Sequence, residues 1–146
     1  MGVECLDLVD FLLIAEQVTG FRVEELSRHP RLQMAEHALS APNAGIGPDE
    51  YYPRFADKAA AMAFQLIKGH PLLDGNKRVG YACLLEFAYR NGYEWSRPPN
   101  DGVERNETVA MIEGVAAGTV NQDQFRDWIQ ERLVEPEGGS TVFVRS

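Results

Sequence analysis

The segment from Asn76 to Asn91 constrains the fold of this chain more than any other part of its sequence. Surface helices carry a polar face, but this segment is apolar almost all the way round. Its apolar residues are Val79, Gly80, Tyr81, Ala82, Cys83, Leu84, Leu85, Phe87 and Ala88. Gly92 follows as a helix stop. Such a helix has to be covered by other helices, so we expect an all-α bundle with this helix at its centre.

Five further segments have the apolar period or the end signals of helices. They are expected at about residues 6–19, 32–39, 54–68, 101–117 (capped by Asn100 or Asp101) and 122–133 (with a capping box of Asn121 and Gln124). The Gly- and Pro-rich stretch 40–50 predicts a loop or a loose hairpin, and residues 93–96 a short extended piece. In the tail, Thr141–Val144 either pairs as a strand or is mobile. We therefore expect one domain over residues 1–134, followed by a tail over 135–146.

The composition is that of an ordinary globular protein, with 45% hydrophobic and 25% charged residues among 146. A net charge of −8 argues against a general nucleic-acid binder, because phosphate backbones are bound by surplus Lys and Arg. No apolar run is long enough to cross a bilayer, and the N-terminus lacks the basic residues of a secretory signal. We therefore expect a cytoplasmic protein with no membrane partner. Cys5 and Cys83 are expected as buried free thiols in helices.

Directly ahead of the central helix lies the stretch His70-Pro71-Leu72-Leu73-Asp74-Gly75-Asn76-Lys77-Arg78. A helix N-terminus attracts anions, so the N–H groups of residues 75–77 are expected to hold phosphate oxygens. Arg78 can clamp a further oxygen, and Asp74 is a candidate Mg²⁺ ligand. His70 is a candidate general base for an incoming hydroxyl. This set of residues predicts phosphoryl or nucleotidyl transfer, which needs positioning, charge neutralisation and a base.

Each of these residues also has a structural interpretation. On that interpretation His70 is a loop histidine bonded to a carbonyl, and Asp74 or Asn76 is a helix cap. Lys77 and Arg78 can be solvated residues of the first turn, but cations there oppose the helix dipole, which favours a functional role. The sequence has no P-loop, no dinucleotide-binding glycine motif, no nucleophile elbow and no zinc-protease motif. The other histidines, at positions 29 and 37, are interpreted as surface or structural residues.

The string HPLLDGNKR resembles the signature of the Fic/Doc (Fido) family, and specifically its death-on-curing toxin branch. The resemblance covers about residues 20–133. It implies an all-helical Fic-type core and a flap at Gly45–Tyr52 that docks the target by strand-like pairing. Leu72 stands where the family usually has phenylalanine, and we expect it to point into the core. The flanking strings in the family's order are Pro30-Arg31-Leu32, Ala38-Leu39, Tyr51-Tyr52-Pro53, Asp57-Lys58-Ala59-Ala60, Asn91-Gly92-Tyr93 and Val115-Ala116-Ala117-Gly118.

The resemblance also implies an activity, which is transfer from ATP, with Mg²⁺, to a hydroxyl of a target protein. Fic adenylyltransferases end the loop with Gly-Asn-Gly-Arg and transfer AMP. In the death-on-curing branch a lysine replaces the second glycine, and the member so described phosphorylates a threonine of elongation factor Tu and stops translation. Lys77 occupies that lysine position. The resemblance makes His70 the base, Asp74 the magnesium ligand, and Asn76, Lys77 and Arg78 the phosphate-binding residues.

The group transferred stays open at this point, because Pro71 and Gly75 match the Fic form of the loop and Lys77 the death-on-curing form. Phosphate transfer by a toxin of a type II toxin–antitoxin system is the first hypothesis. AMP transfer is the second, and a catalytically idle Fido module that only binds a partner is the third. The Ser/Thr-x-x-x-Glu pattern of the self-inhibitory helix is absent from the sequence. A separate antitoxin, laying a helical segment into a groove, is therefore the expected partner.

Overall fold

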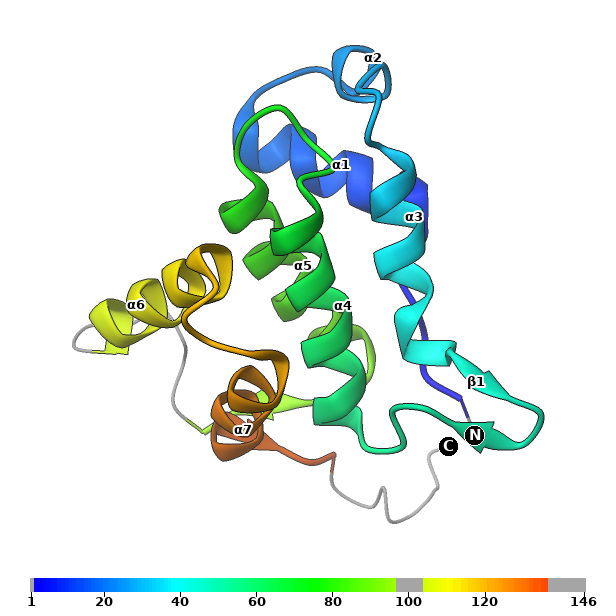
Figure 1. Ribbon diagram of the computed structural model, residues 1–146, viewed down its shortest axis with the longest axis vertical. Helices are drawn as coiled ribbons and strands as arrows, with labels where there is room; N and C mark the ends of the chain where they lie inside the picture. Colours follow the sequence, from blue (N-terminus) through cyan, green and yellow to red (C-terminus); the bar gives the residue numbers. More distant parts are fainter. Residues whose placement is uncertain (1, 97–103, 137–146) are drawn as a thin grey trace.

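The computed structural model describes residues 2–96 and 104–136, which form a bundle of helices with two very short hairpins (Figure 1). The elements are α1 (Leu8–Thr19), α2 (Val23–Leu26), α3 (Gln33–Ser40), η1 (Ala41–Asn43), β1 (Gly45–Ile46), β2 (Asp49–Glu50), α4 (Phe55–Gly69), α5 (Asn76–Arg90), β3 (Glu94–Trp95), α6 (Glu104–Ala117), α7 (Gln122–Arg132) and β4 (Leu133–Val134). The expected mostly helical fold is confirmed. No helix in these two ranges is long and apolar enough to span a bilayer.

The helix that most others contact is α4, and α5 packs along it. α4 meets α3, α5, α6 and α7, because the five alanines between positions 56 and 63 let neighbouring helices come close. α5 was expected at the centre, and one side of it is indeed buried, including Val79, Leu84 and Phe87. Its other side reaches solvent, where Tyr89 is 78% exposed. The core is therefore centred on the α4–α5 pair.

The ends of the helices follow local side-chain chemistry. α1 begins at Leu8, two residues later than predicted, because Asp7 and Asp10 form a capping box there. Cys5 therefore precedes the helix and is half-buried, whereas Cys83 is buried inside α5; both thiols are free. The predicted capping box of Asn121 and Gln124 is confirmed at the start of α7.

Two short elements depart from the expected pattern. α2 forms where a loop was expected, because the Glu25 carboxylate accepts a hydrogen bond from the Arg22 N–H and caps one turn. The last helix ends at Arg132, and Leu133 pairs with Trp95 in the antiparallel hairpin of β3 and β4. The expected extended piece at residues 93–96 is confirmed by that pairing. Asn100, Asp101 and Thr141–Val144 lie outside the described residues.

The expected hairpin within residues 40–50 is confirmed as β1 and β2. They pair antiparallel, with Gly45 opposite Glu50 and Ile46 opposite Asp49. All four of these residues are exposed. In Figure 1 the hairpin projects from the bundle between η1 and the start of α4.

Candidate active site

The predicted site is the turn that joins the end of α4 to the start of α5, next to the C-terminal end of α1 (Figure 1). His70 caps α4 with a left-handed backbone at φ 51° and ψ 55°. It is the one non-glycine residue with a positive φ in the described parts of the chain. This conformation is unfavourable for a residue with a Cβ atom, so the packing around the turn has to impose it. The His70 side chain is exposed.

Leu72 anchors the turn in the core, and Asn76 closes it with two side-chain hydrogen bonds. Leu72 is 2% exposed, which confirms the prediction that it points into the core. The Asn76 Oδ1 atom accepts from the Leu72 N–H at 2.9 Å, and Asn76 Nδ2 donates to the Leu72 carbonyl at 2.9 Å. Asn76 therefore fixes the shape of the turn with its side chain and is not a simple helix cap.

Arg31 holds the other end of the turn, a role that was not predicted from the sequence. Its Nε and Nη2 atoms both donate to the Gly69 carbonyl, at 3.1 and 2.7 Å. That carbonyl would otherwise be one of the unpaired acceptors at the C-terminus of α4. Because it belongs to the peptide bond that leads into His70, Arg31 restrains the backbone from which the imidazole extends.

Gly75 is the residue before α5, and both its backbone and its surroundings require glycine. Its φ is 85°, and a Cβ atom there would lie 2.8 Å from Thr19 Cγ2. Its N–H donates to Asp74 Oδ1 at 2.9 Å, so Asp74 is not the N-cap of α5, contrary to its structural interpretation. The first hydrogen bond within α5 runs from Val79 N to Gly75 O.

The unpaired N–H groups at the start of α5 therefore lie one residue later in the chain than predicted. Three N–H groups precede that first intrahelical bond, those of Asn76, Lys77 and Arg78. Residues 75–77 were expected to supply them, but the N–H of Gly75 is occupied by the Asp74 carboxylate. An anion at this helix end would meet the three N–H groups and the positive end of the dipole.

The two cations of the first turn extend towards different neighbours. Arg78 Nη1 donates to the carbonyl of Val18 in α1 at 3.3 Å. Lys77 Nζ lies 3.9 Å from a carboxylate oxygen of Glu113 in α6, and both side chains are more than half exposed. These are weak surface contacts, so either cation can be redirected to a ligand at small cost.

A cavity of about 670 Å³ lies between the first turns of α5 and the middle of α6. This volume is within the range of cavities that hold small-molecule ligands. Val109 and Ile112 give it an apolar wall, and the two cations stand at its edge. The described residues that line it are Lys77, Arg78, Tyr81, Thr108, Val109, Ile112 and Glu113. The wall from α6 was not predicted, because its residues carry no motif and come together with α5 only in the fold.

Tyr81 contributes a buried polar atom beside this cavity. Its hydroxyl oxygen is buried and has no hydrogen-bond partner among the described residues. Burial raises the pKa of this phenol to about 12, so it stays protonated.

The structure distributes the predicted residues over two cavities. Lys77 and Arg78 line the cavity described above. Asp74 lines a smaller one of about 250 Å³, together with Leu73 and side chains of the α1–α3 connection that include Phe21. His70 is not among the described residues that line either cavity, although it lies on the same turn. His29 accepts a hydrogen bond from the Arg31 N–H, in agreement with a structural role.

No group of three or more His, Cys, Asp and Glu side chains lies close enough to hold a metal ion within residues 2–96 and 104–136. Mg²⁺ is commonly bound by one or two carboxylates, water and substrate phosphates, without a protein cage. Asp74 is an exposed carboxylate just before α5. The N-terminus of that helix attracts anions. The site therefore fits a Mg²⁺ ion that arrives with a phosphate ligand.

Comparisons with known proteins agree with the resemblance found in the sequence. The model of the family described as "Fic/DOC family" matches residues 5–88. A protein named Toxin Doc from Mycolicibacterium smegmatis is 38% identical over 61 residues. The match covers 42% of this chain and 47% of that relative, so the chain spans about half the length of the curated relative that it matches. No solved structure matches the chain.

Proposed function

The chain belongs to the Fic/DOC family, and from this premise we propose that it transfers the γ-phosphate of ATP to a hydroxyl group of a target protein. The observation that carries the proposal is the cavity at the start of α5, with Lys77 and Arg78 at its edge. A lysine at position 77 is the feature that sets the phosphate-transferring branch apart in the resemblance described above. The 670 Å³ volume suits a nucleotide, whose flat aromatic base can pack on Val109 and Ile112.

The proposed reaction assigns one role to each part of the turn. His70 takes the proton of the acceptor hydroxyl, whose oxygen then forms a bond to the γ-phosphorus. The bond from that phosphorus to the bridging oxygen breaks, and ADP leaves with the electron pair. The N–H groups of residues 76–78 and the side chains of Lys77 and Arg78 hold the phosphate oxygens. A Mg²⁺ ion bound with ATP would neutralise phosphate charge, and Asp74, the carboxylate of the turn, would be its ligand from the protein.

We further propose that the protein is the toxin of a type II toxin–antitoxin pair. A relative that matches part of the chain carries the name Toxin Doc. The target expected from the family resemblance is elongation factor Tu, whose phosphorylation would stop translation in the cytoplasm. The partner would be a cognate antitoxin that lays a helical segment into a groove of the toxin.

The test is transfer of label from γ-labelled ATP to purified elongation factor Tu, and to proteins of a bacterial lysate. We expect one labelled band with the unaltered protein. His70→Ala should reduce labelling on the order of a hundredfold or more, because a positioned base is lost. His37→Ala is the matched control, since His37 is an exposed histidine on α3, outside the turn. Labelling that persists unchanged in His70→Ala would refute the assignment of the base.

AMP transfer is the second candidate function, and Gly75 is the observation that favours it. The turn uses a glycine with φ 85° at this position, as the Fic form of the motif has there. α-Labelled ATP separates the two reactions, because an adenylyltransferase labels its target with it and a kinase does not. A target labelled by α-labelled ATP would show that the protein transfers AMP and not phosphate. If Lys77 sets the orientation of the nucleotide, Lys77→Gly should shift the reaction towards AMP transfer.

The third candidate, an idle binding module, makes a different prediction in cells. If the protein only binds a partner, growth arrest on expression should persist in His70→Ala. If it is an enzyme, the same substitution should relieve the arrest.

A further inference from the structure

Lys58 is a buried cation that the proposed reaction does not use. It lies in the second turn of α4 and is 5% exposed, which is unusual for a lysine. Its Nζ atom donates to the Pro42 carbonyl at 3.0 Å and to the Tyr52 carbonyl at 2.6 Å. It also donates to a carboxylate oxygen of Glu50. A buried ammonium is tolerated because three acceptors, one of them charged, replace its water.

The three acceptors of Lys58 lie at the base of the hairpin formed by β1 and β2, which is the expected flap (Gly45–Tyr52). Pro42 lies in the chain that enters the flap, and Tyr52 lies in the chain that leaves it. Glu50 is the last residue of β2. A single ammonium therefore joins the incoming and outgoing chain of the flap to α4. One backbone hydrogen bond, from Tyr51 N to Ala44 O at 3.0 Å, closes the same base.

The flap has little of its own to keep it ordered. Each strand has two residues, and all four are exposed, so the flap contributes no apolar surface to the core through its strands. Isolated two-stranded hairpins are at best marginally stable in water. Its orientation on the bundle therefore has to come from the contacts at its base, and Lys58 makes three of them.

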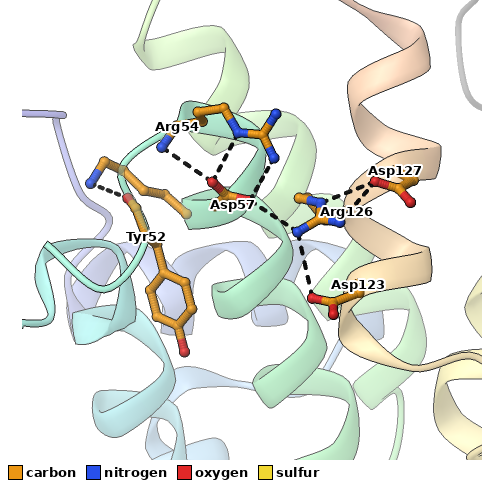
Figure 2. Close-up of polar contacts among 7 residues, drawn as sticks. Tyr52, Arg54, Asp57, Asp123, Arg126 and Asp127 are labelled. Carbon is orange, nitrogen blue, oxygen red and sulfur yellow. Dashed lines mark hydrogen bonds and ion pairs between the residues drawn. The ribbon is translucent and has the colours of Figure 1, made fainter.

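The neighbouring charged residues of α4 serve a different contact. Figure 2 shows Asp57 accepting from Arg54, the N-cap residue of α4, and facing Arg126 of α7. Arg126 is held in turn by Asp123 and Asp127. Asp57 thus ties α4 to α7, whereas Lys58, the next residue, ties α4 to the flap.

We propose that Lys58 is a positioning residue that holds the flap at a fixed orientation on α4, the helix that His70 caps. Through the flap it sets the affinity for the acceptor protein, without contact to the nucleotide. This inference rests on the proposed function and on the expectation from the family resemblance that the flap docks the target. Lys58 would thus couple the flap to the helix that His70 caps.

The first test measures amide hydrogen exchange in the free protein, which requires no ligand. Lys58→Met keeps most of the side-chain volume and removes the charge and the donors. We expect exchange at the Tyr51 amide to become faster on the order of tenfold, while amides in the middle of α4 keep their protection. Arg90→Met is the matched control, because it removes the cation that pairs with Asp10 and Glu86 between α1 and α5. It should leave the Tyr51 amide unchanged.

The second test measures transfer of label to elongation factor Tu over a range of acceptor concentrations. We expect Lys58→Met to raise KM for the acceptor on the order of tenfold, with kcat changed by less than about twofold. Should Lys58→Met fail to fold, Glu50→Gln replaces it, because the Glu50 side chain is 56% exposed and can be changed without unfolding. In Glu50→Gln, hydrogen exchange at the Tyr51 amide should become faster by a smaller factor, on the order of threefold.

The outcomes separate the anchor from the activity. Unchanged exchange at Tyr51 in Lys58→Met, or in Glu50→Gln where only that variant folds, overturns the anchor. Faster exchange with an unchanged KM overturns the link to acceptor binding. An unaltered protein that transfers no label contradicts the proposed function and the kinetic part of this inference, while the exchange result still decides whether Lys58 holds the flap.

Discussion

At the residue scale, the turn between α4 and α5 is held by side chains that bond to main-chain atoms. Asn76 bonds both polar atoms of Leu72, and Arg31 bonds the Gly69 carbonyl twice. These bonds restrain the backbone on both sides of His70. A catalytic group needs such restraint, because its reach and orientation come from the backbone that carries it.

Replacing Asn76 by alanine should therefore cost both stability and transfer activity. It leaves the part-buried N–H and carbonyl of Leu72 without partners, which lowers the free energy of unfolding by about 1–3 kcal/mol. Urea unfolding measures this loss, and the labelling assay measures the fall in activity.

Asn91 supplies the control for that prediction, because its side chain makes the same pair of hydrogen bonds to one backbone residue far from the turn. Its Oδ1 accepts from the Glu4 N–H at 2.8 Å, and its Nδ2 donates to the Glu4 carbonyl at 3.0 Å. Asn91→Ala should lose a similar free energy of unfolding and keep the transfer activity. If both variants lose activity in proportion to stability, Asn76 has no special role in the site.

The sequence located the residues of the turn but not all the contacts that hold it. The nine-residue motif is local, so its histidine, carboxylate and cations could be identified from spacing alone. Arg31 and Lys58 act on segments 38 and 16 residues away along the chain, at Gly69 and Pro42, and such pairings are decided by the fold. A lysine within an otherwise apolar helix face was a usable signal for Lys58, whereas Arg31 was noted only as part of the string Pro30-Arg31-Leu32, which does not indicate its partner.

At the element scale, α4 and α5 pack closely because Gly80 lies against Ile67. A Cβ atom at position 80 would be 2.7 Å from Ile67 Cγ1 and 3.7 Å from the Ala63 carbonyl oxygen. In an exposed helix, alanine is favoured over glycine by about 1 kcal/mol. At position 80, an alanine would overlap a buried side chain, and this destabilisation is larger than the gain in helix propensity.

Gly80→Ala should accordingly lower the free energy of unfolding, by about 1–3 kcal/mol. Gly80→Ala should cost less in an Ile67→Ala background, because that variant lacks Cγ1, the atom that the new methyl group would overlap. Chemical denaturation of the two single variants and the double variant gives the coupling energy directly. A stabilised Gly80→Ala would show that helix propensity, and not packing with α4, controls this position.

The helices of this protein were predictable to the extent that their signals are local. Apolar period and capping boxes located α1, α4, α5 and α7 within about two residues, as such signals allow. α2 has four residues, too few for a period to show. Leu133 continues the apolar pattern of α7, but it pairs with Trp95, and that long-range choice is invisible to a helix pattern. The cavity wall from α6 depended on the same kind of long-range contact.

At the scale of the whole molecule, the buried thiol of Cys83 links stability to pH. Burial, together with the negative charges of Asp10 and Glu86, raises the pKa of this thiol to about 12 from an ordinary value of 9.0. The unfolded chain therefore loses this proton first as the pH rises. Stability from Cys83 is complete below pH 9.0 and is lost progressively between there and about pH 12.

Cys83→Ala should make the protein less sensitive to alkali, even though it removes a buried sulfur atom. The lost packing lowers the free energy of unfolding at every pH, whereas the lost titration changes its slope. From about pH 8 to about pH 10 the unaltered protein should lose roughly 1.4 kcal/mol more than the variant, since each pKa unit corresponds to about that energy. Urea unfolding at several pH values measures both slopes. Tyr81, whose pKa is also raised by burial to about 12, is present in both proteins, so its contribution above pH 10 cancels in the comparison. Parallel slopes would mean that Cys83 is reached by water in the folded protein, and that the core between α1 and α5 is more open than its burial indicates.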